Sequence, residues 1–515
     1  MVDSPSQVEG GARARVRGGS LRSRVEAAGT FGPAALLMGG RLVGFAAAFA
    51  IPIALARIFT PAEFGTYKQL FLVAGTLYCL GQFGLAESLL YFLPLDPRRA
   101  PRYAFNSLLA LIVGGAACLI LVVAFREEIA GWLGNPDLAH YTTLLGTYLL
   151  LMLTSAGLEN AMIARKRYGR AAATYVGLDL ARAAFLLVPS LVARDLEWLL
   201  RGAVAFAALR CLMALWSLRA EFRGELAPSG PLLGRQLAYA LPFQLAATVE
   251  IVQAKLHQYV VASHFDAATF AVYAVGCLDI PVAEFATSAV VNVLMVRMAE
   301  QRRNGREGAA VALWHEATRK LAMLFFPLAI GLMVTGQALI VTLFTEQYRA
   351  SGPVFVVLSA ALLLPALAVD GVLRVYAETR YLLGLNLVRL LLTASLISWF
   401  IADFGLVGAA AVTVIAAAVT RALGLARMSR VTGLPLTALL PWRSLGGILL
   451  AATAAAVPAA VVGWVLEASP LVSLGLAGAT FGVAYLIALW AFGALSEDER
   501  AIVRGWLALR PAPAP

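Results

Sequence analysis

Long apolar segments recur along the whole chain, and they restrict its fold more than any other feature. Examples are residues 104–125, 142–163 and 385–402, each close to the ~20 residues that a helix needs to cross the hydrocarbon of a bilayer. The 515-residue chain is 60% hydrophobic and only 14% charged, so it has too little polar surface to cover a soluble protein of this size. We therefore expect an all-α polytopic membrane protein.

The apolar segments predict about 14 transmembrane helices. The first segment is longer than the apolar core of a signal peptide and many others follow it, so we expect it to be retained as a helix. The expected spans are residues 32–56, 67–94, 104–125, 142–163, 171–193, 199–218, 238–262, 269–296, 319–344, 353–377, 385–402, 405–425, 445–466 and 472–495.

Most of the 41 Lys and Arg residues fall in loops on one side of these spans. Residues 165–170 and 297–306 are strongly basic, whereas residues 263–266 and 467–470, on the other side, contain neither Lys nor Arg. The positive-inside rule makes the basic side cytoplasmic, and an even number of spans then places both termini there. We expect a multi-pass protein of the bacterial inner (plasma) membrane. The net charge of +11 is spread over many short loops, so no nucleic-acid partner is expected.

The chain contains an internal repeat. Residues 59–67 (FTPAEFGTY) align with residues 265–273 (FDAATFAVY), with identities at two Phe, one Ala and one Tyr. Each segment lies at the outside turn between the first two helices of a six-helix block, so the blocks share one orientation in a pseudo-two-fold arrangement, as in transporters that enclose a midplane site. The expected regions are a basic cytoplasmic N-terminal tail (1–30), a first six-helix block (31–219), a cytoplasmic linker (220–237), a second six-helix block (238–426), a cytoplasmic loop with two extra helices (427–495) and a cytoplasmic C-terminal tail (496–515).

Ionisable residues within the spans are the main candidates for function, because a charge in hydrocarbon is unstable unless it is paired or hydrated. The basic ones are Arg41, Arg182, Arg210, Lys255, Arg374, Arg389 and Arg421, and the acidic ones include Glu87, Asp179, Glu250, Asp279, Glu284 and Asp370.

The span 238–262 is polar along one whole side. One stripe at helical spacing comprises Gln244, Thr248, Lys255 and Gln258, and the adjacent stripe comprises Glu250, Gln253 and His257. Such a surface should face water or a polar substrate, because lipid would leave its donors unsatisfied. We therefore expect this helix to line a cavity.

Some intramembrane charges have candidate partners on their own helix. Asp370, Arg374 and Glu378 are spaced at i+4, and Asp179 and Arg182 at i+3, so these groups are either structural ion pairs or site residues. A third set has no such partner, which favours cavity lining, although the last two of its members could also extend to the cytoplasmic face. This set is Arg41, Arg210, Lys255, Arg389 and Arg421.

Motifs of soluble enzymes are missing from the sequence. It contains no HExxH, Walker or GxSxG motif, and the histidines and cysteines lack metal-binding spacing. We expect no catalytic residues, no metal and no cofactor other than a coupling ion. The histidines are His140, His257, His264 and His315, and the cysteines are Cys79, Cys118, Cys211 and Cys277.

Two adjacent segments, 56–67 (ARIFTPAEFGTY) and 81–88 (GQFGLAES), resemble polysaccharide-precursor flippases of the Wzx type. These belong to the superfamily that includes multidrug extruders. The resemblance implies translocation of undecaprenyl-pyrophosphate-linked oligosaccharide from the cytoplasmic to the periplasmic leaflet, by alternating access, for O-antigen, capsule or exopolysaccharide assembly. A polysaccharide polymerase and a chain-length regulator are the implied protein partners.

With such a substrate, intramembrane cations would bind the pyrophosphate and intramembrane carboxylates would bind a coupling H⁺ or Na⁺. The pyrophosphate-binding candidates are Arg41, Arg210, Lys255, Arg374 and Arg389. The ion-coupling candidates are Glu250, Asp279, Glu284 and Asp370.

Two other functions remain open at the level of sequence. A multidrug or metabolite extruder of the same superfamily would more often have an acidic cavity for cationic substrates. A membrane-embedded glycan polymerase or ligase would need acid–base groups in an outside loop, where the best candidates are Glu127, Glu128 and His140.

Overall fold

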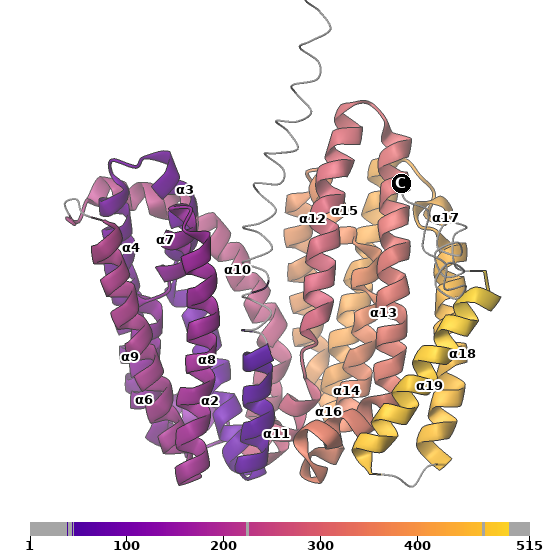
Figure 1. Ribbon diagram of the computed structural model, residues 1–515, viewed down its shortest axis with the longest axis horizontal. Helices are drawn as coiled ribbons and strands as arrows, with labels where there is room; N and C mark the ends of the chain where they lie inside the picture. Colours follow the sequence, from indigo (N-terminus) through magenta and orange to yellow (C-terminus); the bar gives the residue numbers. More distant parts are fainter. Residues whose placement is uncertain (1–38, 40–43, 45, 223–225, 466–468, 494–515) are drawn as a thin grey trace, which may run out of the picture. The chain divides into compact units, whose positions relative to one another are not determined.

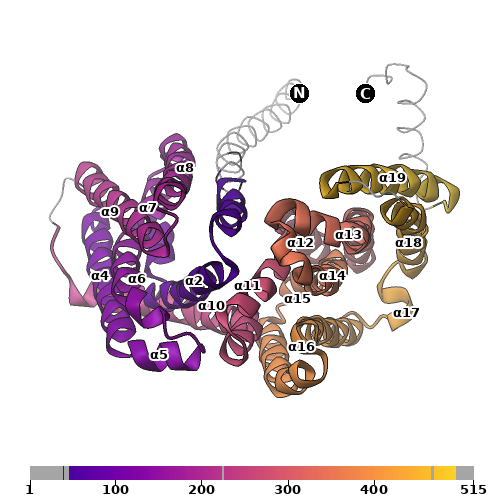
Figure 2. The ribbon, with the colours of Figure 1, turned by 90° about the horizontal axis from the view of Figure 1, so that it is seen from below.

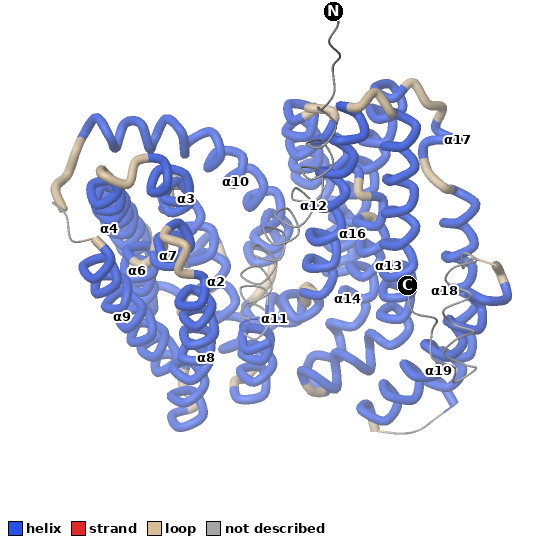
Figure 3. Tube along the Cα trace, turned by 45° about the horizontal axis from the view of Figure 1, so that its top comes forward, coloured by secondary structure: helices blue, strands red, loops and turns tan. Residues whose placement is uncertain are grey.

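A computed structural model describes residues 39, 44, 46–222, 226–465 and 469–493 (Figure 1). Every regular element in these ranges is a helix, as the tube representation in Figure 3 shows. The all-α expectation is therefore confirmed. Both tails and Arg41 lie outside the described residues.

Eleven of the described helical segments are long and apolar enough to cross a membrane, and two shorter apolar helices, Ala46–Ile58 and Ala267–Gly276, accompany them. The longest element, α16 (Thr379–Thr432), has 54 residues, and a straight helix of that length would extend about 80 Å, far beyond a bilayer. Gly405 interrupts it with φ 58° and ψ −138°, a conformation largely restricted to glycine. This helix therefore contains both spans expected at 385–402 and 405–425, in agreement with about 14 spans.

Several other expected spans are interrupted. The span expected at 353–377 consists of α14 (Gly352–Ser359), two short 3₁₀ turns and α15 (Val369–Val375). The span expected at 269–296 consists of α11 (Ala267–Gly276) and α12 (Pro281–Arg303). Apolar length predicts that such segments cross the membrane but does not show where they break.

The chain divides into two compact units. The first contains the described residues of 1–52, 81–120 and 144–243. Its helices are α3 (Leu85–Leu95), α4 (Ala100–Ala124), most of α6 (Leu138–Thr154), α7 (Leu158–Ala164), α8 (Tyr168–Ala193), α9 (Leu196–Glu221) and the start of α10 (Gly230–His264).

Small residues allow the helices of the first unit to pack closely. A Cβ atom on Gly202 of α9 would lie 2.0 Å from the carbonyl oxygen of Phe185 on α8. The two backbones therefore meet at a distance that only glycine permits, as is common between membrane helices. Gly177, which also lies on α8, faces open space.

The second unit contains residues 53–80, 121–143 and the described residues of 244–515. Its helices include most of α2 (Pro61–Gly81), α5 (Arg126–Trp132), the rest of α10, α11 to α16, α17 (Leu436–Leu439), α18 (Trp442–Val465) and α19 (Pro470–Ala491). Figure 2 shows α18 and α19 side by side.

The core of the second unit is built around α13 (Glu307–Phe344). Trp314 is fully buried there and donates its indole N–H to the carbonyl oxygen of Leu367 at 2.9 Å. Tyr485 of α19 donates to the carbonyl oxygen of Met323 at 3.1 Å. The two C-terminal helices are thus attached to α13 by apolar packing and by a hydrogen bond.

The close approach at Gly202 generates the first prediction. Gly202→Leu should force α8 and α9 apart and lower the free energy of unfolding by about 1–3 kcal/mol, the usual effect of overpacking. The measurement is the melting temperature of the purified protein in detergent. Gly177→Leu is the matched control and should leave the melting temperature nearly unchanged; equal losses in both variants would contradict the assignment.

Candidate functional site

The second unit contains a polar cavity of about 260 Å³ in a largely apolar surrounding. It lies between α10, the break that separates α11 from α12, and α14. Its polar lining residues are Lys255, His257, Gln258, Cys277, Asp279 and Ser359. The apolar walls include Phe355, Leu358 and Leu362.

The helix break supplies one wall of this cavity. Helix α11 ends at Gly276, and α12 begins at Pro281, a residue that favours the first position of a helix because it has no N–H to leave unsatisfied. The residues between these helices are not helical, and Asp279 is among them. The break therefore places an acidic side chain in the cavity wall, and non-helical backbone within a membrane protein is tolerated where it lines such a cavity.

Two lysines accompany the Asp279 carboxylate. Lys255 of α10 lines the cavity, and Lys68 of α2 lies within electrostatic range of both Lys255 and Asp279. The Lys68 ammonium also lies 5.4 Å from the centre of the Phe64 ring, a cation–π contact. Two cations thus share one carboxylate.

Lys68 is not among the site residues predicted from the sequence, because it stands at the edge of the span expected at residues 67–94. Its position one helical turn after Phe64 is a signal that could have revealed it. In the structure it belongs to α2, well inside a helix that runs from Pro61 to Gly81.

A second group of charges lies on α15 and α16. The Arg421 guanidinium is 3.0 Å from the Asp370 carboxylate, and Arg389 lies within electrostatic range of both. The Nε atom of Arg389 is buried and has no hydrogen-bond partner. Arg389 is also within electrostatic range of His257, which relates this group to the cavity.

Cations exceed carboxylates in this part of the second unit. Its described cations are Lys68, Lys255, Arg389 and Arg421, and its described carboxylates are Asp279 and Asp370. The difference is two positive charges, which attracts an anion with more than one negative charge.

The remaining predicted cation sites lie elsewhere. Arg210 is in the first unit, where its guanidinium is 2.8 Å from Glu159. The expectation that it lacks a partner on its own helix therefore stands, but a carboxylate of another helix, α7, pairs with it. Arg374 is exposed in the last turn of α15. Arg374 also does not form the predicted ion pairs with Asp370 and Glu378. Asp370 contacts Arg421 instead, and Glu378 contacts Arg427 at 2.8 Å.

The ion pairs of Arg210 and Arg421 occupy matching positions in the repeat. Glu159 is the second residue of α7 and Asp370 is the second residue of α15; both are seven-residue helices. Each carboxylate contacts an arginine 51 residues further along the chain. The repeat that was predicted from residues 59–67 therefore extends to the fourth helix of each block.

The other predicted ion-coupling residues have different environments. Asp279 lines the cavity, whereas Glu250 is exposed on α10. Glu284 belongs to α12, but its side chain lies outside the described part of the chain.

The polar side of α10 serves two purposes. Gln244, near the middle of α10, donates to the carbonyl oxygen of Cys79 on α2 at 2.6 Å. Tyr259, nearer the C-terminal end of α10, donates to the hydroxyl of Thr76 on α2 at 2.8 Å. Lys255 and Gln258 line the cavity. Part of the predicted polar stripe therefore attaches α10 to α2, and the rest faces the cavity.

The segment 56–67 joins the N-terminal part of the second unit to α11 and α13. Arg57 donates to the carbonyl oxygens of Thr342 and Leu343 at the C-terminal end of α13. Thr60 and Glu63 form a capping box at the start of α2. A Cβ atom on Gly65 would lie 1.8 Å from the carbonyl oxygen of Ala267, so α2 and α11, the two copies of the repeated segment, are in backbone contact.

Comparisons with known proteins agree on the fold. The sequence profile of a family described as "polysaccharide biosynthesis protein" matches residues 54–353. A structure of lipid II flippase MurJ in an inward closed conformation is 12% identical, with a TM-score of 0.69 over 89% of this chain and 98% of that one. A search of the curated proteins finds no match.

Two more distant structures are transporters. An inward-facing multidrug resistance MATE family transporter of the MOP superfamily is 14% identical, with a TM-score of 0.58 over 75% of this chain and 94% of that one. A MOP superfamily transporter from Pyrococcus furiosus, whose title reports a binding pocket of reverse polarity, is 16% identical, with a TM-score of 0.53 over 78% and 94%. The predicted superfamily fold is confirmed, and the chain is a multi-pass membrane protein.

The buried ion pair of the first unit gives the second prediction. Glu159→Gln removes the carboxylate that contacts the Arg210 guanidinium and leaves only Asp179 within electrostatic range, so it should lower the free energy of unfolding by up to about 3 kcal/mol. The exposed pair of Glu316 and Lys320 is the control, because Glu316→Gln should cost about 1 kcal/mol or less. Thermal unfolding in detergent measures both, and equal losses would contradict a role for burial.

Proposed function

Because the chain belongs to the polysaccharide biosynthesis protein family, we propose that it is a flippase for undecaprenyl-pyrophosphate-linked oligosaccharide. It would carry this lipid from the cytoplasmic to the periplasmic leaflet by alternating access, for O-antigen, capsule or exopolysaccharide assembly. The proposal places the protein in the bacterial inner membrane with both termini in the cytoplasm, as the distribution of basic loops predicts.

The observation that carries the proposal is the excess of positive charge around the cavity. A pyrophosphate and its sugars cannot cross hydrocarbon while they keep their water, so protein groups must replace that water. Lys255, Lys68 and Arg389 supply charged donors for phosphate oxygens. Gln258 and the helix break near Asp279 supply hydrogen-bonding groups for sugars, while the lipid tail remains in the bilayer.

The sign of the charge argues against a multidrug extruder that carries cations. Such a transporter needs an excess of carboxylate in its cavity, because two cations do not share a low-dielectric site. Around Asp279 the two lysines outnumber the carboxylate. The site therefore favours an anionic substrate.

Asp279 is the best-placed residue for coupling to an H⁺ or Na⁺ gradient. Among the predicted ion-coupling residues whose side chains the structure describes, it is the one that lines the cavity together with Lys255. Neutralising its carboxylate with an ion would increase the net positive charge and strengthen anion binding in one state of the cycle. The proposal includes a polysaccharide polymerase and a chain-length regulator as downstream partners, since they act on the translocated product.

Alternating access requires that one end of the cavity close while the other opens. Gly65 and Ala267 lie in the turns that the charge distribution predicts to be periplasmic, and they are in backbone contact. Arg57 secures the same end by binding the last carbonyl groups of α13. We infer that these contacts close the periplasmic end and separate when the cavity opens outward.

This closure gives the third prediction. Gly65→Ala places a methyl group against the carbonyl group of Ala267, so the closed periplasmic end cannot form and transport should fall at least about tenfold, equivalent to about 1.4 kcal/mol. Gly75→Ala, on the same helix but facing open space, should transport normally. The measurement is restoration of surface polysaccharide in cells that lack the gene, at equal membrane abundance; normal transport by Gly65→Ala would contradict the closure.

The cavity cations give the fourth prediction. Lys255→Ala should reduce transport at least about tenfold, because a charge-assisted bond to phosphate contributes about 1.5–3 kcal/mol. Lys320→Ala removes an exposed lysine that pairs with Glu316 and should retain transport. The variants are compared by the amount of lipid-linked oligosaccharide that becomes accessible on the periplasmic side.

The leaflet on which the substrate accumulates tests the function itself. In cells without the gene, complete lipid-linked units should accumulate on the cytoplasmic leaflet and surface polysaccharide should be lost. If lipid-linked units instead reach the periplasmic leaflet normally but remain unpolymerised or unligated, this protein does not carry out the translocation step. That result would favour a polymerase or ligase instead.

A further inference from the structure

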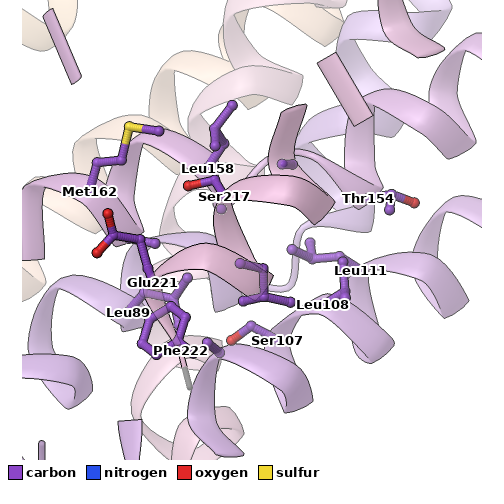
Figure 4. Close-up of a pocket in the computed structure, with 15 residues that line it drawn as sticks. Leu89, Ser107, Leu108, Leu111, Thr154, Leu158, Met162, Ser217, Glu221 and Phe222 are labelled. Atoms are coloured by element: carbon purple, nitrogen blue, oxygen red, sulfur yellow. The ribbon is translucent and has the colours of Figure 1, made fainter. Parts of the chain in front are cut away.

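The apolar pocket of the first unit is too small for a ligand. It lies between α3, α4, α7 and α9 (Figure 4) and has a volume of about 40 Å³, far below the ~300–1,000 Å³ of pockets that hold small ligands. Leu89 of α3 lines this pocket and is buried. Glu87 and Tyr91, on the opposite side of α3, are exposed. This helix therefore presents an acidic and an aromatic side chain away from the packed interior.

Three exposed aromatic rings lie together where α3 meets α10. The Tyr91 ring of α3 stacks on the Tyr239 ring of α10, with the ring centres 4.6 Å apart and an angle of 11° between the planes. The Phe243 ring, one turn further along α10, has its centre 5.5 Å from that of Tyr239. Tyr91, Tyr239 and Phe243 are 46%, 37% and 66% exposed. These three residues form an aromatic row.

Buried contacts hold the aromatic row in place. Phe92 of α3 is 7% exposed and packs edge-on against Tyr239, with the ring centres 5.5 Å apart. It also stacks on Tyr103 of α4 at 4.9 Å. The buried Gln236 of α10 donates a hydrogen bond to the hydroxyl of Ser107 on α4 at 2.9 Å. Rings that are fixed from behind lose little conformational freedom when a ligand contacts their exposed surface.

Charged groups accompany the aromatic row on both helices. Glu87 is exposed one turn before Tyr91 on α3, and Arg235 is exposed one turn before Tyr239 on α10. Glu87 lies eight residues before the last residue of α3, about 12 Å along the helix axis. A carboxylate at that depth is unstable against hydrocarbon, so this face of α3 borders a polar space and not lipid.

The ends of these helices place the aromatic row on the side where the proposed transport begins. Helix α3 ends at Leu95 and is followed by Arg98 and Arg99, and α10 begins at Gly230, after the linker that is expected to be cytoplasmic. The positive-inside rule therefore assigns both ends to the cytoplasmic side.

We propose that the aromatic row binds sugar rings of the lipid-linked oligosaccharide when it enters from the cytoplasm. One face of a pyranose ring carries mainly C–H groups, whose slightly positive hydrogens match the negative face of an aromatic ring. The sugar hydroxyl groups donate to the Glu87 carboxylate and accept from the Arg235 guanidinium. The inference rests on the proposed function, because it requires a substrate that contains a glycan.

The proposal separates recognition of the sugar from recognition of the pyrophosphate. All residues of the aromatic row belong to the first unit, whereas the cation-rich cavity belongs to the second. Changes in the row should therefore weaken binding of the glycan and leave binding of the pyrophosphate intact.

The test is calorimetric binding of two probes to the purified full-length protein in detergent. One probe is the free oligosaccharide that mild acid releases from the lipid-linked units of cells lacking the gene, and the other is undecaprenyl pyrophosphate, which carries no sugar. Tyr91→Leu/Phe243→Leu should weaken oligosaccharide binding at least about tenfold, because each ring contact contributes a factor of roughly two to ten. Binding of undecaprenyl pyrophosphate should not change. Trp216→Leu, which removes an exposed ring of α9 in the same unit, is the matched control and should bind both probes normally.

Two further variants distinguish sugar binding from contact with lipid. Tyr91→Phe/Phe243→Tyr keeps both rings and should bind the oligosaccharide nearly as well as the unaltered protein. Glu87→Leu should weaken oligosaccharide binding without raising the melting temperature. If this face instead contacts lipid, as aromatic belts at the membrane surface do, Glu87→Leu should raise the melting temperature and leave oligosaccharide binding unchanged.

Three results would overturn the proposal. The aromatic row is not a sugar site if the unaltered protein fails to bind the oligosaccharide, or if Tyr91→Leu/Phe243→Leu binds it normally. Equal losses for both probes, with a lower melting temperature, would leave the rings a structural role only. If the double variant does not fold, Phe243→Leu alone, which changes the most exposed ring of the row, decides the question. Failure of the proposed function is recognised separately, by the leaflet on which lipid-linked units accumulate in cells without the gene.

Discussion

Compensation of charge within hydrocarbon is the constraint on which the rest of this structure depends. Arg210 with Glu159, and Arg421 with Asp370, form ion pairs at matching positions of the repeat. Each pair fastens a short helix to a helix much later in the chain. Around the cavity of the second unit, the described cations outnumber the described carboxylates by two. The positive charge of that cavity therefore depends on which charged side chains lack a partner of opposite sign. It does not depend on the total number of charged residues in the sequence.

Sequence reasoning succeeded where a property repeats over many residues. Apolar length predicted the membrane fold, and the polar side of α10 correctly placed Lys255 and Gln258 at a cavity. It failed where a partner is distant along the chain. Arg210 has no carboxylate three or four residues away on its own helix, so helical spacing could not reveal Glu159, 51 residues earlier. The same limit misassigned Asp370, whose partner is on α16 and not on α15.

Helix breaks were equally hard to predict, and they are what builds the site. The segment between α11 and α12 is apolar enough to suggest one continuous span, yet Pro281 starts a new helix and leaves Asp279 at the cavity wall. A proline in an apolar segment does not by itself show whether a helix bends or ends there. Its consequence depends on whether the freed backbone groups face lipid or a polar space, and that is decided by packing against α10 and α14.

The family-like segment 56–67 illustrates how a sequence motif can reflect packing and not chemistry. Its Arg57 binds backbone carbonyl groups of α13, Glu63 caps its own helix, and Gly65 makes room for the backbone of α11. None of these residues lines the cavity described in the second unit. In the proposed transport cycle, a motif of this kind would be informative about function because it would specify how one end of the cavity closes. The residues that would recognise the substrate are then free to differ with the substrate, provided that their charges remain in excess.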